Sequence, residues 1–196
     1  MKMTYKLAEM QKKADEIVDL ITPYCDHVEV AGSIRRQKSK VSDIEIIYIP
    51  KYNEDLRFNL FNDKPQTLIS DLRIYLQTAP DFKRRLNKLG YTTFGCKIQL
   101  MLYKNKYPVD FFATTQEGWA ITKLLRTGSK EFNIFIINQA LLNGYKISVE
   151  NNCLEKISTK EFIYPKTELE IFNLFGLDYI LPANRNELQN IKRDYR

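Results

Sequence analysis

Three carboxylates stand where buried strands normally carry apolar side chains. Asp43 and Glu45 lie one residue apart in the apolar run DIEIIYIP, and Asp110 lies within YPVDFFA. Side chains alternate between the faces of a strand, so Asp43 and Glu45 share one face. Two like charges side by side repel each other unless a cation lies between them. The pair therefore predicts either a cation site or an edge strand with a solvated polar face.

Asp110 favours the cation site, because it repeats the same arrangement in a second predicted strand. Pairing between strands can bring it close to Asp43 and Glu45. Oxygen ligands without His or Cys suit Mg²⁺ or Mn²⁺, and three carboxylates can hold two such ions. Two-metal sites promote in-line phosphoryl transfer, so the acids indicate chemistry on phosphates.

A Gly-Ser pair precedes the acids. Gly32 and Ser33 follow a predicted strand, and Arg35, Arg36, Lys38 and Lys40 come next. A turn of this kind can direct backbone N–H groups and a hydroxyl at a phosphate. By itself the basic stretch favours an ordinary solvated loop. The order of strand, Gly-Ser, basic residues, Asp-x-Glu and a distant strand Asp makes the phosphate interpretation more specific.

Hydrophobic periodicity predicts the elements that position these residues. Apolar residues at helical spacing predict a first amphipathic helix that Pro23 ends. We expect helices over 5–21, 67–77 and from 167, strands over 27–32 and 43–50, one or two basic helical turns over 81–91, a hairpin over 97–114, two helices separated at 127–129, a small hairpin over 146–157 and a terminal extended segment. The stretch after Pro50 is expected to be a loop.

These elements predict an α+β fold. A mixed sheet with helices is expected up to about residue 115, followed by a smaller unit of helices and a hairpin, which divides the chain into 1–115 and 116–196.

No run of about 18 apolar residues and no secretory signal is present, so we expect an intracellular, cytoplasmic protein without a membrane partner. The three cysteines are far apart and predict neither disulfides nor a zinc site. The net charge of +6 suits a polyanionic partner.

The ordered set of motifs resembles the nucleotidyltransferase superfamily, whose signature is G-S followed by D-x-[DE]. Within it, the chain is similar to the family X DNA polymerases, the group of DNA polymerase beta. LLRTGSKEFN (124–133) resembles that family's TGS segment with its following Phe-Asn, and TELEIFNLFGLDYILPANRN (167–186) resembles its C-terminal stretch. The resemblance implies a nucleotidyltransferase palm followed by a small thumb-like subdomain. In extent the chain is similar to small viral members, so no lyase activity is expected.

The resemblance also implies roles for individual residues. Asp43, Glu45 and Asp110 would bind two Mg²⁺ ions, with Mn²⁺ as an alternative. Ser33 and Arg36, beside Gly32, would hold the β and γ phosphates of an incoming nucleotide. Thr127, Gly128 and Ser129 would form the turn against its sugar, and Asn133 would face the minor-groove edge of its base.

The chain departs from the family pattern at several positions. Ser42 stands where the family usually has glycine, and Glu45 where it usually has Asp. Leu125 and Arg126 replace aromatic residues at the sugar, and Arg126 could instead reach a phosphate or the template strand. The longer side chain of Glu45 keeps the charge but moves the oxygens.

We therefore predict a template-dependent DNA polymerase that adds deoxynucleotides to a primer 3′-hydroxyl, in short gaps during DNA repair. Its partners would be gapped or primed DNA and deoxynucleoside triphosphates, and it is expected to be a monomer. Candidate DNA-binding residues are Lys83, Arg84, Arg85 and Lys88, together with Lys192, Arg193 and Arg196. The alternatives are a nucleotidyltransferase with another acceptor, such as a template-independent terminal or RNA end-adding enzyme, and a non-catalytic nucleic-acid-binding relative.

Overall fold

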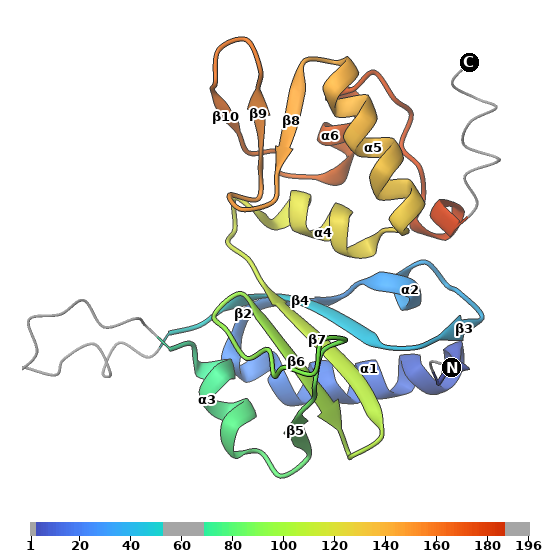
Figure 1. The fold of residues 1–196 in the computed structure, drawn as a ribbon, viewed down its shortest axis with the longest axis vertical. Helices are drawn as coiled ribbons and strands as arrows, with labels where there is room; N and C mark the ends of the chain where they lie inside the picture. Colours follow the sequence, from blue (N-terminus) through green and yellow to red (C-terminus); the bar gives the residue numbers. More distant parts are fainter. Residues whose placement is uncertain (1–2, 53–68, 187–196) are drawn as a thin grey trace, which may run out of the picture.

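A five-stranded sheet forms the first half of the chain (Figure 1). The computed structural model describes residues 3–52 and 69–186. The strands lie in the order β2 (Cys25–Val30), β4 (Ile44–Pro50), β7 (Tyr107–Ala113), β6 (Ile98–Tyr103) and β5 (Phe82–Arg84). β4 and β7 run parallel, and the other neighbours are antiparallel. The α+β class predicted from the sequence is confirmed.

One face of this sheet is covered by α1 (Leu7–Ile21) and α3 (Asp71–Thr78). The α1 side chains Met10, Ala14 and Ile17 recur at helical spacing and are fully buried. They pack in one core with the strand residues Ile44, Ile46, Tyr48, Val109 and Phe111. Because side chains alternate, Glu45 and Asp110 must lie on the opposite face. A short 3₁₀ helix (Thr22–Tyr24), which contains Pro23, follows α1.

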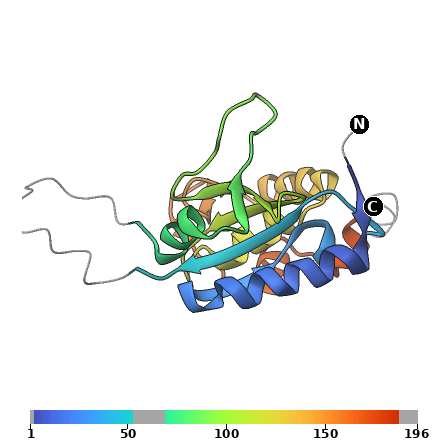
Figure 2. The same ribbon diagram turned by 90° about the horizontal axis from the view of Figure 1, so that it is seen from below.

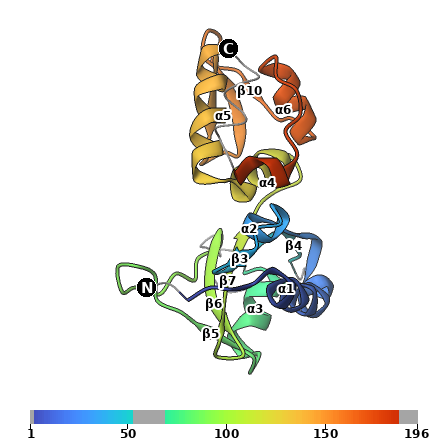
Figure 3. The ribbon, with the colours of Figure 1, turned by 90° about the vertical axis from the view of Figure 1, so that its right-hand side faces the viewer.

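The second half of the chain builds a separate cluster of buried residues. Its elements are α4 (Trp119–Thr127), α5 (Lys130–Leu142), a three-stranded sheet of β8 (Tyr145–Ser148), β9 (Cys153–Lys156) and β10 (Phe162–Ile163), α6 (Glu168–Leu174) and the 3₁₀ turn Pro182–Asn186. Ile121, Phe132, Ile136 and Phe172 are fully buried in this cluster. We call the parts on either side of residue 115 the sheet lobe and the helical lobe. Figure 3 shows them one above the other.

The division into two domains at residue 115 stays a prediction, because the lobes also share contacts. Ala31, Ile47 and Phe112 form a small buried group on the acid-bearing face, and Trp119 of α4 packs against it. The chain passes between the lobes directly after β7 (Figure 1). None of the helices in the described parts of the chain is long and apolar enough to cross a membrane.

The sequence prediction was wrong for residues 81–91. Instead of helical turns, this stretch forms β5 and then a loop that projects from the sheet (Figure 2). Asn87 donates its backbone N–H to the Tyr91 carbonyl, and Gly90 supplies a positive φ of 81° between them. Among the described residues, β5 is an edge strand whose one neighbour is β6, and the basic side chains of such a strand do not interrupt its pairing.

Smaller elements were also missed. Residues Gly32–Arg35 form a short helix, α2, and β1 (Tyr5–Lys6) pairs with β3 (Lys40–Val41). The expected terminal extended segment instead includes the 3₁₀ turn Pro182–Asn186. Most of the loop expected after Pro50 lies outside the described residues, as do Lys192, Arg193 and Arg196.

Candidate functional site

Glu45 and Asp110 lie side by side on the face of the sheet opposite α1 and α3. They are direct register partners on the parallel strands β4 and β7, and paired residues project from the same face. Asp43 immediately precedes β4, and its Oδ1 accepts a hydrogen bond of 3.0 Å from the Ser42 hydroxyl. The predicted proximity of acids from two distant segments thus follows from the strand pairing.

Gly32 makes room for the Glu45 carboxylate. A Cβ atom at residue 32 would lie 1.8 Å from Oε2 of Glu45, and the glycine adopts a positive φ of 62°. The two segments are joined by a backbone hydrogen bond of 2.8 Å from Ala31 to the Glu45 carbonyl. The glycine of the G-S motif is therefore required both for its backbone conformation and for the close approach of an acid.

The surroundings of Glu45 disfavour its charged form. Burial, together with the negative charges of Asp43 and Asp110, raises the pKa of Glu45 to about 7 against the opposing effect of Arg36 and Arg126. This is the behaviour of carboxylates that share one site. A cation placed among the three acids would favour the charged form of Glu45 and lower its pKa.

The residues fit a divalent metal in type and in backbone position, but their side chains are not assembled around one. Within residues 3–52 and 69–186, no three His, Cys, Asp or Glu side chains are grouped as a metal site. Asp110 instead forms an ion pair with Arg85, whose Nη2 donates to its Oδ1. The predicted Mg²⁺ or Mn²⁺ site therefore stays a prediction.

A cavity of about 400 Å³ opens beside the acids. It is lined by Thr4, Ser33, Arg36, Lys38, Lys40, Ser42, Asp43 and Glu45. The Oγ of Ser33 is buried and makes no hydrogen bond to the described residues. A buried hydroxyl without a partner is costly, whereas an anion in this basic cavity would supply an acceptor. Ser33 and Arg36 thus lie where a phosphate could reach both.

Arg36 also contacts the turn between α4 and α5. Its Nη1 donates to the carbonyl of Thr127, and its Nε donates to Oδ1 of Asn186 at 2.8 Å. Burial lowers the pKa of Arg36, while Glu45 acts in the opposite direction. The guanidinium therefore links the acid site to the helical lobe.

The Thr127-Gly128-Ser129 turn is buried between the lobes. Ser129 caps α5 by accepting from the Phe132 N–H, and its hydroxyl donates to the Arg185 carbonyl at 2.9 Å. A Cβ at Gly128 would lie 3.2 Å from Nη1 of Arg36. The turn thus adjoins Arg36, and its contact with a nucleotide sugar stays a prediction.

A larger cavity, of about 550 Å³, is lined by residues of both lobes. Asn133, Arg126, Phe112 and Ile98 are among its lining residues. Asn133 donates its Nδ2 to the Leu125 carbonyl at 2.8 Å, while its Oδ1 is buried without a hydrogen bond to the described residues. Asn133 thus lines the cavity and carries an amide oxygen without a donor among the described residues, and its contact with a nucleobase edge stays a prediction.

Arg126 lies over a ring and faces the acids. Its guanidinium carbon is 3.8 Å from the centroid of Phe112, a cation–π distance. Burial lowers the pKa of Arg126, and attraction to Glu45 and Asp110 opposes that effect. The sequence identified Arg126 as a departure from the family pattern, but its stacking on Phe112 depended on the fold.

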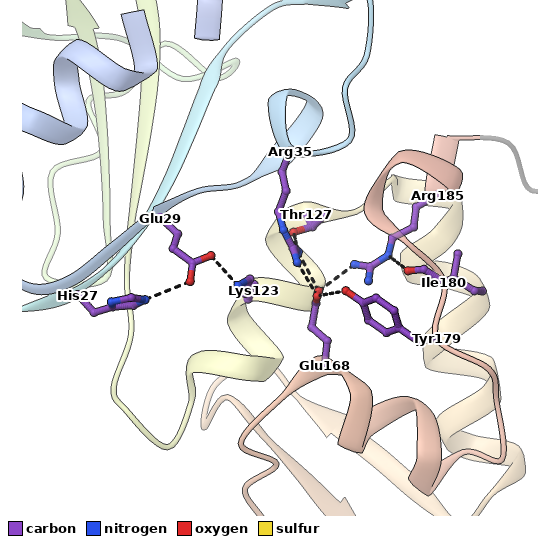
Figure 4. A network of polar contacts seen from close by, with 9 residues as sticks. All are labelled: His27, Glu29, Arg35, Lys123, Thr127, Glu168, Tyr179, Ile180 and Arg185. Atoms are coloured by element: carbon purple, nitrogen blue, oxygen red, sulfur yellow. Dashed lines mark hydrogen bonds and ion pairs between the residues drawn. The ribbon is translucent and has the colours of Figure 1, made fainter. Parts of the chain in front are cut away.

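A second carboxylate, Glu168 at the start of α6, joins the lobes (Figure 4). It accepts bidentate hydrogen bonds from Arg35 of α2 at 2.9 and 2.6 Å, one from Arg185 at 2.9 Å and one from the Tyr179 hydroxyl at 2.9 Å. Burial opposes ionisation, but the hydrogen bonds from Arg35 and Arg185 lower the pKa of Glu168 to about 2. We call this group the Glu168 clamp.

Sequence analysis did not predict the clamp, although Arg35, Glu168 and Arg185 all stand within the quoted motifs. The contact between Arg35 and Glu168 joins residues 133 positions apart. Of the candidate DNA-binding residues, Lys83, Arg84 and Lys88 are exposed, and the Arg84 guanidinium lies 4.3 Å from the Phe94 ring centroid. Arg85 is half-buried against Asp110 instead.

Comparison with known proteins identifies the helical lobe. A search of the curated proteins found no match to the chain. Residues 122–186 match the family model described as DNA polymerase beta thumb. The match runs from α4 to the 3₁₀ turn and includes Asn133, the Thr127-Gly128-Ser129 turn and the Glu168 clamp apart from Arg35. This part of the chain is therefore similar in sequence to the thumb of DNA polymerase beta.

Proposed function

We propose that the protein is a template-dependent DNA polymerase of the family X type, with residues 1–115 as palm and 116–196 as thumb-like subdomain. The observation that carries the proposal is the direct pairing of Glu45 with Asp110 beside a basic cavity, which is also lined by Ser33, whose buried hydroxyl has no hydrogen-bond partner among the described residues. The thumb-type sequence of residues 122–186 supports the same function. The proposed substrates are gapped or primed DNA and deoxynucleoside triphosphates.

The two cavities suit the two ends of a nucleotide. In the smaller one, Ser33 donates its hydroxyl to a phosphate oxygen, and Arg36, Lys38 and Lys40 neutralise the phosphate charges. In the larger one, the Oδ1 of Asn133 accepts a hydrogen bond from the base edge. Glu45 lines the smaller cavity, and its register partner Asp110 stands two residues before Phe112, which lines the larger one.

Asp43, Glu45 and Asp110 would hold Mg²⁺ or Mn²⁺ ions, which supply charge neutralisation and activation of the attacking hydroxyl when bound. The chain's own contribution is to hold the nucleotide and the primer end in line and to exclude water from the gap between the lobes. Asp110 would approach the primer 3′-hydroxyl.

Primer extension tests this function. Purified protein is incubated with Mg²⁺ or Mn²⁺ and each deoxynucleotide on a duplex with a one-nucleotide gap, on a primed single strand and on a primer without template. We expect addition of the complementary nucleotide to the gapped duplex. Addition of any nucleotide without a template would instead identify a terminal transferase, and extension of an RNA primer alone would identify an RNA end-adding enzyme.

Two variants separate chemistry from folding. Asp110→Asn is expected to lower the extension rate by about 100-fold or more, because it removes a charged ligand from the reacting centre. Asp81→Asn changes an exposed acid of the same lobe and should extend primers normally. Equal rates for wild type and Asp110→Asn, with both folded by circular dichroism, would reject the proposed mechanism.

The Arg85–Asp110 ion pair favours a second candidate function. An acid already neutralised by an arginine needs no metal, as expected in a nucleic-acid-binding relative that has lost catalysis. Such a protein would bind primed DNA with equal affinity in the presence of Mg²⁺ or a chelator and would extend no primer. Electrophoretic mobility shifts under both conditions measure this alternative.

A further inference from the structure

Arg85 lies in line with the acids across the sheet. Asp110 of β7 pairs with Leu100 of β6, and the backbone N–H of Arg85 donates to the Leu100 carbonyl at 3.0 Å. The register Arg84 with Met101 places Arg85 opposite Leu100 as β5 ends. Glu45, Asp110, Leu100 and Arg85 therefore form one row on one face. The Arg85 side chain reaches over Leu100 to the Asp110 carboxylate.

The ion pair is shielded from water. The exposed fractions of the Arg85 and Asp110 side chains are 24% and 15%. The Nε of Arg85 is buried and makes no hydrogen bond to the described residues. Asp110 is thus an important partner for this guanidinium. The pair is worth more than an exposed salt bridge because solvent screens it less.

The same carboxylate would be needed by a metal ion. A guanidinium donor and a divalent cation both bind the lone pairs of carboxylate oxygens. They also repel each other when both approach one carboxylate. The absence of a grouped metal site among the described residues is explained by this contact, since Asp110 is directed to Arg85.

We propose that Arg85 is an internal competitor of the divalent cation: it occupies the Asp110 carboxylate when no metal is bound and must release it when metal binds. The inference rests on the proposed function, because it assumes the same metal site. It assigns Arg85 a role different from DNA binding. Arg85 lowers the affinity for metal, and it keeps Asp110 neutralised in the metal-free protein.

A competing role and a supporting role make opposite predictions. If Arg85 held Asp110 in the geometry that metal requires, its removal would weaken metal binding. If Arg85 competes, its removal strengthens binding. Arg85→Met is the suitable change, because it keeps a long side chain over Leu100 and removes the charge and the donors.

The experiment is a titration of the protein with Mn²⁺ alone, followed by the electron paramagnetic resonance signal of free Mn²⁺. We expect Arg85→Met to bind Mn²⁺ about five- to tenfold more tightly than wild type, as loss of one charge-assisted contact implies. Arg85→Lys should bind with intermediate affinity, because it keeps the charge but loses the planar guanidinium. Circular dichroism establishes that each variant is folded.

Lys83→Met is the matched control. It also removes one positive charge, from an exposed side chain of β5 two residues before Arg85. Its Mn²⁺ affinity should stay within about twofold of wild type, because exposed charges are screened. An equal gain in Lys83→Met and Arg85→Met would reduce the effect to net charge and overturn the proposal.

Asp110→Asn distinguishes failure of this inference from failure of the proposed function. If Asp110→Asn weakens Mn²⁺ binding but Arg85→Met binds as wild type or more weakly, the metal site stands and the competitor role is overturned. If wild type, Arg85→Met and Asp110→Asn all fail to bind Mn²⁺, both the metal site and the inference are overturned.

Discussion

Glu45 and Glu168 are partly or fully buried glutamates near arginines, yet their pKa values move in opposite directions. The pKa of Glu168 falls to about 2, whereas that of Glu45 rises to about 7. Glu168 receives hydrogen bonds from Arg35, Arg185 and Tyr179, which together satisfy both oxygens. Glu45 has Asp43 and Asp110 as neighbours.

The difference separates a structural acid from a functional one. Complete pairing makes the Glu168 clamp a stable joint between the lobes. Asp43, Glu45 and Asp110 repel one another, and a bound cation would stabilise their charged forms. A perturbed pKa caused by burial and like charges beside a cavity is typical of functional sites.

Loss of the clamp should have the largest effect on stability. Glu168→Gln removes the negative charge that pairs with two arginines, of which Arg185 is fully buried. We expect a loss of about 3 kcal/mol in the free energy of unfolding at pH 7, because breaking one side of a buried ion pair leaves an uncompensated charge. Urea denaturation measures it, with the exposed Glu161→Gln as control.

The same experiment has a pH dependence of known sign. The folded pKa of Glu168 lies below the ordinary value of 4.5, so its stabilisation is fully present above pH 4.5 and disappears as the pH falls towards 2. The difference between wild type and Glu168→Gln should shrink over that range. A difference that is constant from pH 7 to pH 3 would contradict ionic pairing.

Gly32→Ala should have the next largest effect. Alanine at position 32 would have an unfavourable positive φ, and its Cβ would clash with Oε2 of Glu45. We expect about 2 kcal/mol of destabilisation, of which the backbone accounts for about half. Gly90→Ala is a matched control, since Gly90 also has a positive φ but no atom within 4 Å of its Cβ.

Glu45→Ala in the Gly32→Ala background tests the source of the remaining cost. Removing the carboxylate should recover most of the difference between Gly32→Ala and Gly90→Ala. Thermal or urea unfolding of wild type, Gly32→Ala, Glu45→Ala and the double variant completes the cycle. If removing the carboxylate recovers no stability, a clash between the new Cβ and Glu45 is not the cause of the extra destabilisation.

Glu45→Gln should stabilise the metal-free protein, opposite to Glu168→Gln. The folded pKa of Glu45 is raised, so the ionised carboxylate costs free energy as the pH rises from 4.5 to 7. We expect a gain of about 1 kcal/mol at pH 8 that vanishes near pH 4. Unfolding by urea in the presence of a chelator measures it; destabilisation at pH 8 would place Glu45 in the same class as Glu168.

The smallest effect concerns the ion pair between Lys123 and Glu29, which also joins the lobes (Figure 4). The two groups are 2.6 Å apart but partly exposed. Lys123→Met should cost about 0.5 kcal/mol, and less at high salt, because solvent and ions screen the pair. A loss as large as that of Glu168→Gln would show that burial does not distinguish the two joints.

The sequence by itself determined most of the elements and the identity of the acids. The alternation of DIEIIYIP and the paired strands of the 97–114 hairpin were sufficient, because periodicity reflects which face of an element is buried. The largest exception was residues 81–91, where basic residues without clear alternation were assigned to helical turns although β5 pairs with β6. Strand formation there depends on a partner distant in sequence, which a local pattern does not contain.

Only the tertiary structure decided what each charge contacts. Arg85 seemed equivalent to Lys83 and Arg84 in the sequence, but the register of β5, β6 and β7 directs it to Asp110. Arg35 and Glu168 are 133 positions apart and meet because the lobes pack together. Residue type fixes the charge that a side chain can carry, whereas its energy depends on burial and on the neighbours that folding supplies.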